Sequence, residues 1–199
     1  MPTGVALRDV REQLFEAADR VLLRDGPSAL TSRAVTVEAG CAKGVLHRHF
    51  ADFDAFLAEF IVDRAGRMQP QATALRESAG TGSVTGNLAA ALTALFSSVA
   101  LSIVALVTFR DELRARLRQT WPAGVPVLTE AAAVIACYLS MERDRGRIAA
   151  DADVGTLAAM LIGTGHLLFA DRGGAPPDAG EVARMVATVI AGAVPEPPP

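Results

Sequence analysis

The sequence is poor in the residues that mark secreted, metal-binding or disordered proteins. Cys41 and Cys137 are the only cysteines, too few for a disulfide framework, and neither has a neighbour at metal-ligand spacing. No apolar run follows the N-terminus, so no signal peptide is expected. Hydrophobic residues make up 51% of the chain and charged residues only 21%, which excludes a disordered polypeptide. We therefore expect a globular, cytoplasmic protein that keeps its thiols reduced.

Aromatic residues are also scarce, at 5%, whereas alanine accounts for almost a fifth of the chain. Alanine is the strongest helix former, and the residues typical of strands do not dominate, so the composition predicts an all-α fold. Lys43 is the only lysine, and the net charge is −3. This charge argues against a protein that coats nucleic acid through bulk charge, but it leaves room for one local basic face.

The longest stretch without charge covers residues 78–109, and its core, 88–109, is long enough to cross a bilayer as a helix. Serine and threonine interrupt this core, many of its apolar positions are alanine, and no belt of Trp or Tyr flanks it. A helix that is apolar on all sides can be buried in protein as well as in lipid. We favour a buried helix and no membrane partner, with a membrane span as the alternative.

Apolar residues recur at helical spacing through most of the chain. The first helix ends at Asp25-Gly26-Pro27, because glycine suits the position after a helix and proline cannot continue one. Thr31 is a good N-cap for the second helix, and Pro70 marks a break or kink. The expected helices after the first lie at about residues 32–38, 42–50, 53–68, 87–97, 100–120, 128–144, 154–170 and 181–193.

Residues 31–50 read as two short helices around a glycine turn, which is a helix-turn-helix. Cys41, Leu46 and Phe50 are spaced to face inward and to hold the second helix at a fixed angle. Polar and small residues are then left on the outer side of a helix narrow enough for a major groove: Lys43, Gly44, His47 and Arg48. Ser32 and Arg33 open the first helix, whose positive end suits a phosphate.

These residues, with the helices on either side, resemble the DNA-binding domain of the TetR family of bacterial transcriptional regulators over about residues 8–67. The positions that fit the family's pattern directly are Thr31, Ser32, Val35, Ala39, Gly40, Lys43, Gly44, Leu46, His49 and Phe50. Four positions depart from it. Thr36 and Cys41 stand where the family has Ala and Val, and His47 and Phe53 replace a Tyr and a Lys that in the family usually contact phosphates.

The resemblance implies a three-helix DNA-binding domain over residues 8–68, a helical ligand-binding and dimerisation domain over 69–194, and a flexible tail at 195–199. It also implies that the last two helices, 154–170 and 181–193, pair with their counterparts in a second subunit. The residues expected to contact DNA are Thr31, Ser32, Arg33, Lys43, Gly44, Val45, His47, Arg48 and His49.

The sequence contains no motif of a hydrolase, a zinc protease, a phosphate-binding loop or a dinucleotide site, so neither an enzyme nor a cofactor is expected. The helices at 88–109, 128–144 and 154–170 offer a mainly apolar wall for a small, mostly apolar ligand. Its larger candidate residues are Phe96, Phe109, Tyr138 and His166. A lone histidine such as His166 in an apolar helix is more often a core or interface residue than a ligand contact.

The function predicted from the sequence is a homodimeric, ligand-responsive repressor that binds a pseudo-palindromic operator. Two alternatives stay open at this point. One is a membrane-anchored DNA-binding regulator that uses residues 88–109 as a span. The other is a small-molecule-binding or enzymatic helical protein whose helix-turn-helix is incidental.

Overall fold

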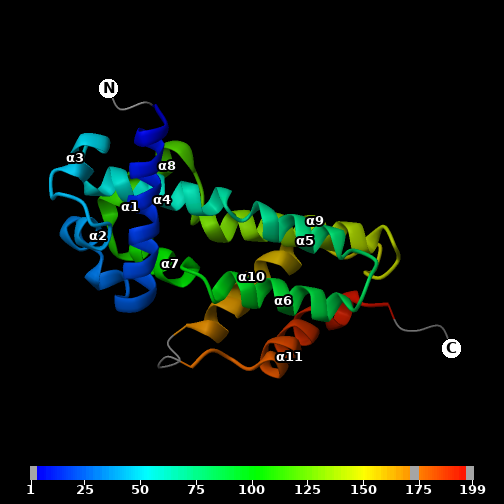
Figure 1. Cartoon of the computed structure of the whole chain (residues 1–199). Coiled ribbons are helices and arrows are strands. Elements are labelled where there is room, and N and C mark those ends of the chain that lie inside the picture. Colours follow the sequence, from blue (N-terminus) through cyan, green and yellow to red (C-terminus); the bar gives the residue numbers. More distant parts are fainter. Residues whose placement is uncertain (1–3, 171–174, 196–199) are drawn as a thin grey trace. The chain divides into compact units, whose positions relative to one another are not determined.

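The computed structural model describes residues 4–170 and 175–195, and within these ranges the chain is helical and contains no strand (Figure 1). The all-α prediction is therefore confirmed. The α-helices are α1 (Gly4–Asp25), α2 (Ser32–Glu38), α3 (Val45–His49), α4 (Phe53–Gly66), α5 (Gln69–Glu77), α6 (Val84–Phe96), α7 (Ala100–Phe109), α8 (Asp111–Thr120), α9 (Pro126–Arg143), α10 (Val154–Phe169) and α11 (Ala179–Ile190). Two 3₁₀ turns lie at Pro27–Ala29 and Ala191–Ala193.

Several helix ends lie where local sequence signals place them. The first helix ends at Asp25 and is followed by Gly26 in the left-handed region, with φ 79°. The predicted break near Pro70 is observed, since α4 ends at Gly66 and α5 begins at Gln69 with the proline in its first turn. The N-cap of α10 is Asp153, whose side chain accepts hydrogen bonds from two backbone N–H groups of the first turn.

Two predicted helices differ from those observed. The helix expected at 100–120 is two helices, α7 and α8, because Arg110 has an extended backbone, with φ −125° and ψ 100°. Arg114 donates hydrogen bonds to the carbonyls of Val107 (3.1 Å) and Thr108 (2.8 Å), which satisfies backbone groups at the end of α7. The second helix of the helix-turn-helix is also shorter than expected, because α3 begins at Val45 and the residues before it form a turn.

The chain divides into two compact units. The first unit contains Met1–Arg64 and Leu101–Pro126, and the second contains Ala65–Ala100 and Val127–Pro199. The units do not coincide with the domains expected at 8–68 and 69–194, because α7 and α8 belong to the first unit. The expected tail lies mostly outside the described residues.

The core of the first unit contains a cluster of phenylalanine rings from α1, α4 and the end of α3. Phe15, Phe50, Phe56 and Phe60 are all at most 6% exposed. The ring centroids of Phe50 and Phe56 lie 5.1 Å apart in an edge-to-face arrangement, and those of Phe15 and Phe56 lie 5.6 Å apart. This cluster connects the helix-turn-helix to the helices on either side of it.

In the second unit, α6 packs against α5, α10 and α11, and α10 packs against α11. The contact between α6 and α10 depends on Gly165, because a Cβ at this position would lie 2.6 Å from Cε2 of Phe96. The Phe96 ring also lies 5.4 Å from the ring of Phe169. A small residue on α10 thus allows an aromatic residue of α6 to be buried.

No single helix in the described ranges is long and apolar enough to cross a membrane. One pair, α6 and α7, passes such a test together by length and composition, but the two helices are bent by 56° at the break between them.

Candidate nucleic-acid interface

Local interactions at both ends define α2, the first helix of the helix-turn-helix. Its N-cap Thr31 accepts a hydrogen bond from the backbone N–H of Ala34 (3.1 Å). At the other end, Gly40 has φ 66°, and Cys41 N–H donates to the carbonyl of Thr36 (2.9 Å). This is a Schellman turn, in which the glycine takes the left-handed conformation that a side chain disfavours. The predicted glycine turn is confirmed.

The second helix, α3, is fixed from its inner side. Leu46 is fully buried and Phe50, its C-cap residue, is 4% exposed. The third residue expected inside, Cys41, is only half-buried, because it lies in the turn before α3. Leu46 and Phe50 therefore determine which side of α3 faces away from the core.

The basic side chains on the outside of the motif have no hydrogen-bond or ion-pair partner in the part of the chain that the structure describes. Arg33, Lys43 and Arg48 are exposed, and within the described ranges none of them makes a hydrogen bond or an ion pair. The one acidic residue between positions 31 and 50, Glu38, is already paired with Arg20 and Arg24, at 2.7 and 2.9 Å. These arginines hold the pKa of the Glu38 carboxyl below its usual value. The motif is thus locally basic on a chain of net charge −3.

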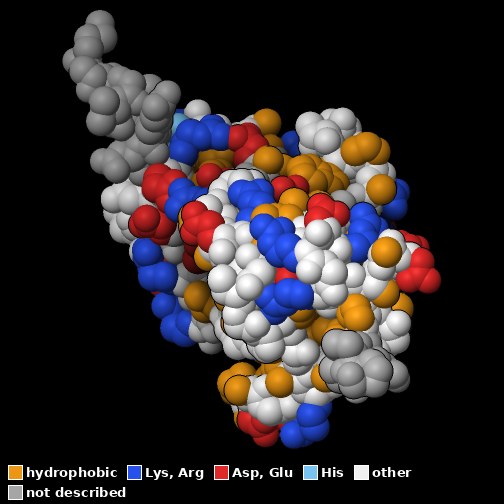
Figure 2. Space-filling view, turned by 90° about the vertical axis from the view of Figure 1, so that its right-hand side faces the viewer, with side chains coloured by type: hydrophobic (Ala, Val, Ile, Leu, Met, Phe, Trp, Pro, Cys, Tyr) orange, Lys and Arg blue, Asp and Glu red, His pale blue; other side chains and the backbone are white. Residues whose placement is uncertain are grey.

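Other parts of the surface lack this uniform charge. On the face drawn in Figure 2, basic, acidic and hydrophobic side chains are interspersed. Mixed charges of this kind are typical of a solvated protein surface and attract no polyanion in particular.

The remaining expected DNA contacts lie at different depths. Thr31, Gly44 and His47 are exposed, whereas Ser32, Val45 and His49 are half-buried. A Cβ added at Gly44 would meet no atom within 4 Å, so the backbone there is open to a ligand. The nine expected residues thus all lie in the two helices and the turn, with differing access to the surface.

Two positions that depart from the family pattern, Thr36 and Phe53, have local explanations. The buried hydroxyl of Thr36 donates to the carbonyl of Ser32 (3.0 Å), so this polar side chain is satisfied within its own helix. Phe53 stacks on Phe56, with 5.6 Å between ring centroids. The guanidinium of Arg110 lies over the Phe53 ring, 5.5 Å from its centroid.

Some contacts that support the motif join residues that lie far apart in the sequence. Arg116 donates to Asp52 (2.9 Å) and Arg110 to Asp54 (2.8 Å), which joins α8 to the first turn of α4. Asp52 also caps α4 through the N–H of Ala55 (2.7 Å), and these interactions lower the pKa of its carboxyl. The partners are more than 50 residues apart in the sequence, so no local signal connects them.

The four expected ligand-binding residues have different surroundings, each described within its own unit. Phe96 and His166 are neighbours in the second unit, with ring centroids 6.3 Å apart, and Phe96 is buried. Tyr138 is fully buried at another place, where Asn87 donates to its hydroxyl (3.0 Å). Phe109 is 85% exposed and belongs to the first unit.

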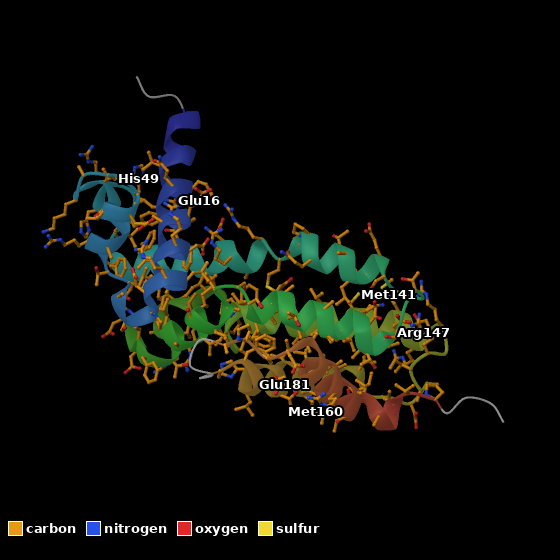
Figure 3. All side chains as sticks on the ribbon, turned by 60° about the horizontal axis from the view of Figure 1, so that its bottom comes forward. Glu16, His49, Met141, Arg147, Met160 and Glu181 are labelled. Atoms are coloured by element: carbon orange, nitrogen blue, oxygen red, sulfur yellow. The ribbon has the colours of Figure 1, made fainter. Side chains whose placement is uncertain are left out.

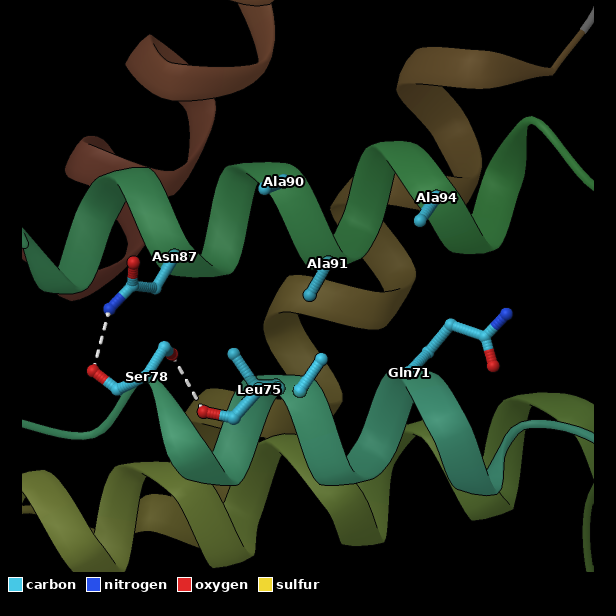
Figure 4. A pocket seen from close by; sticks show the side chains of 8 residues that line it. Gln71, Leu75, Ser78, Asn87, Ala90, Ala91 and Ala94 are labelled. Atoms are coloured by element: carbon cyan, nitrogen blue, oxygen red, sulfur yellow. Dashed lines mark hydrogen bonds between the residues drawn. The ribbon is translucent and has the colours of Figure 1, made fainter.

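A small open groove of about 240 Å³ lies between α5 and α6 (Figure 4). Most of its lining is alanine and leucine, and its polar end carries Asn87, which donates to the carbonyl of Ser78 (3.3 Å). The lining residues are Gln71, Ala74, Leu75, Ser78, Asn87, Ala90, Ala91 and Ala94. The described residues contain no group of His, Cys, Asp and Glu side chains able to hold a metal ion.

Comparisons with known proteins agree with this geometry. Residues 14–60 match the family described as bacterial regulatory proteins, tetR family. No curated protein sequence matches the chain.

Solved structures of regulators share the fold over almost the whole chain. A regulator of Mesorhizobium loti assigned to the TetR family is 16% identical, with a TM-score of 0.71 over 93% of this chain and 95% of its own. A TetR transcription regulator of Haloarcula marismortui is 16% identical, with a TM-score of 0.67 over 94% and 100%. FadR of Bacillus subtilis, solved with stearoyl-CoA, is 16% identical, with a TM-score of 0.63 over 91% and 98%. Residues 14–60 therefore match the tetR family of bacterial regulatory proteins, and the chain shares its fold with solved transcriptional regulators.

Proposed function

We propose that the chain is a ligand-responsive repressor that binds a pseudo-palindromic operator as a homodimer. The observation that carries this proposal is a set of three exposed basic side chains on the helix-turn-helix, Arg33, Lys43 and Arg48, which have no partner among the described residues. Phosphates and base edges are the partners that such side chains find in a duplex. His47, on the same exposed side of α3, is a further candidate contact.

The proposed dimer uses the outer surface of α10 and α11. On α10, Met160 is 47% and Leu167 77% exposed, although both are large apolar residues. Between them lies Gly163, where an added Cβ would meet no atom within 4 Å. Exposed apolar side chains beside small residues suit close helix packing against a second copy. Figure 3 labels Met160 on α10 and Glu181 on α11.

For the effector, we propose a small and mostly apolar molecule that binds in the groove between α5 and α6. The alanine-rich wall offers apolar contact, and the polar end at Asn87 can orient a ligand by a hydrogen bond. The groove is smaller than the roughly 300–1,000 Å³ typical of drug-sized ligands, so it favours a compact molecule or a site that widens on binding. FadR of Bacillus subtilis, which has the same fold, was solved with stearoyl-CoA.

One selection experiment tests the DNA-binding role. The full chain is mixed with a random-sequence duplex library, and bound duplexes are recovered, amplified and sequenced over several rounds. We expect an enriched inverted repeat whose half-sites lie about one helical turn, or a multiple of it, apart. Light scattering should give the mass of a dimer. An enriched sequence without two-fold symmetry, or a monomer at micromolar concentration, would contradict the proposed mode of binding.

The repressor role needs a separate measurement in cells. The enriched duplex is placed between a promoter and a reporter gene, with a scrambled duplex as the control. Expression of the chain should lower reporter output only from the enriched duplex. A rise in output would identify an activator instead.

A further inference from the structure

The recognition helix α3 contains only five residues, Val45–His49. Isolated helices shorter than about a dozen residues are barely stable in water, so contacts from outside must hold α3 in place. Leu46 and Phe50 hold its inner side, as described above. Its C-terminal carbonyl groups have no partners within so short a helix and need a donor from elsewhere.

Arg11 of α1 provides this donor. Its Nη1 donates a hydrogen bond to the backbone carbonyl of His49 (3.2 Å), the last residue of α3. Its guanidinium lies over the ring of Phe50, 4.4 Å from the ring centroid. Its other terminal nitrogen, Nη2, pairs with the carboxylate of Glu59 on α4. Figure 3 labels His49 beside α1.

These contacts join three helices through one side chain. A positive charge at the C-terminal end of a helix is favourable because it faces the negative end of the helix dipole. The planar guanidinium can donate to two acceptors in fixed directions and stack on a ring at the same time, which an ammonium group cannot do. The side chain of Arg11 is 36% exposed, so these contacts form at the edge of the core.

We propose that Arg11 is a positioning residue for DNA recognition: it sets the direction of α3 through the His49 carbonyl and the Phe50 ring, and it does not itself contact the DNA. Glu59 keeps the guanidinium in the required orientation. The inference rests on the proposed DNA-binding function. It assigns to α1 a part in sequence recognition that the helix-turn-helix motif alone does not contain.

The test compares Arg11→Met and Arg11→Lys with the wild-type chain. The probe is the duplex enriched by the wild-type chain from the random library, and a scrambled duplex of the same composition measures non-specific binding. Affinities are measured at several salt concentrations, well below the melting midpoint of every variant. Circular dichroism confirms that each variant is folded at the assay temperature.

We expect Arg11→Met to bind the enriched duplex about tenfold more weakly and the scrambled duplex as the wild type does. The slope of log affinity against log salt should not change, because the variant still contacts the same phosphates. Arg11→Lys should also bind the enriched duplex more weakly than the wild type does, since lysine cannot donate to two acceptors in fixed directions and stack on the Phe50 ring at the same time. Glu59→Gln should weaken binding less, and it should add nothing in the Arg11→Met background.

Arg24→Met is the matched control. Arg24 also lies on α1, but its partners are Asp25 and Glu38, and Glu38 keeps Arg20 as a partner when Arg24 is replaced. This variant should bind the enriched duplex as the wild type does.

Three results would overturn the inference while leaving the proposed function intact. Wild-type affinity in Arg11→Met would show that α3 needs no such support. A salt slope lowered by about one, with equal loss on both duplexes, would make Arg11 a phosphate contact. An equal loss in Arg24→Met would make the effect one of general charge. Failure of the wild-type chain to enrich any duplex would overturn the proposed function, and the inference with it.

Discussion

Two groups of arginines in this chain have opposite surroundings. Arg33 and Arg48 of the helix-turn-helix are exposed and make no hydrogen bond or ion pair in the described structure. Arg143, Arg145 and Arg147, at the end of α9 and just after it, all have partners in the protein. The side chains of the first group are available to a ligand, whereas those of the second group donate hydrogen bonds to backbone carbonyls of the protein.

One member of the second group, Arg147, lies against a buried carboxylate. Glu142 is fully buried, accepts a hydrogen bond from the N–H of Gly80 (3.2 Å) and lies 3.4 Å from Nε of Arg147. Arg147 also donates to the carbonyl of Gly82 (2.7 Å), and Arg145 donates to that of Met141 (2.7 Å). Figure 3 labels Met141 and Arg147 at this end of the second unit. We call Gly80, Gly82, Glu142 and Arg147 the Glu142 cluster.

The contrast shows why residue type alone does not assign a role. An arginine near a buried carboxylate and carbonyl groups forms hydrogen bonds and ion pairs within the protein, because leaving those groups without a donor costs free energy. An arginine on a surface that offers no acceptor keeps its full hydrogen-bonding capacity for another molecule. The absence of partners among the described residues is therefore the property that distinguishes the arginines proposed to contact DNA.

The largest effect expected from this contrast is on DNA affinity. Replacing Lys43 and Arg48 together by Ala should weaken binding of the enriched duplex on the order of a thousandfold, since each side chain contributes roughly 1–3 kcal/mol. The salt slope should fall by about one for each phosphate that the variant no longer binds. The paired change Arg143→Ala with Arg145→Ala also removes two positive charges and should leave the affinity unchanged. Equal losses in both double variants would mean that only total charge matters.

The next effect is on stability and concerns the Glu142 cluster. Arg147→Met leaves the buried Glu142 carboxylate without its ion-pair partner, which should lower the free energy of unfolding by about 3 kcal/mol. Arg145→Met removes one hydrogen bond at an exposed site and should cost at most about 1 kcal/mol. Urea unfolding of both variants measures the difference. Equal stability of the two would remove the structural role assigned to the cluster.

The same distinction between inward and outward positions applies to two glycines of α10. Gly165→Ala places a Cβ against the Phe96 ring and should destabilise the chain by about 1–3 kcal/mol. Gly163→Ala has open space and a better helix propensity, so it should stabilise the monomer fold by up to about 1 kcal/mol. Thermal unfolding compares the two.

If α10 pairs with a second copy near Gly163, Gly163→Ala should weaken dimerisation while the fold stays intact. Sedimentation at several concentrations measures the dimer dissociation constant. Unchanged dimerisation would place the interface elsewhere.

The smallest effect is a titration near the Glu142 cluster. Burial, and then the nearby Glu142 carboxylate, raise the pKa of Tyr138 to about 12. An unfolded chain releases this proton near pH 10, so the stabilisation is complete below about pH 10 and is lost as the pH rises toward 12. Tyr138 is the only tyrosine, so phenolate absorbance reports on it alone.

The control for this titration is Tyr138→Phe, whose stability should decline less steeply than that of the wild type over the same pH interval. Phenolate absorbance of the folded wild type that rises near pH 10 would contradict the shift.

Local signals were sufficient to predict much of the fold and the position of the motif. Thr31 and Gly40 act within one turn of the chain, and each forms the cap or turn expected of it. The helix break at Arg110 was not predicted, although Asp111 and Glu112 just after it are typical of a helix start. The uniformly apolar pattern before that point favoured a continuous helix.

The sequence by itself determined the all-α class, the helix-turn-helix at residues 31–50 and its excess of basic side chains, because capping, glycine turns and apolar periodicity act between near neighbours. Only the tertiary structure decided which arginines lack a hydrogen-bond or ion-pair partner among the described residues. It also brought Arg11 to the end of α3, Arg116 to Asp52 and Asn87 to Tyr138, across 38 to 64 residues of sequence. It likewise buried Phe96 and left Phe109 85% exposed. The physical reason is that hydrogen bonds and ion pairs depend on distance in space, and helix packing sets that distance.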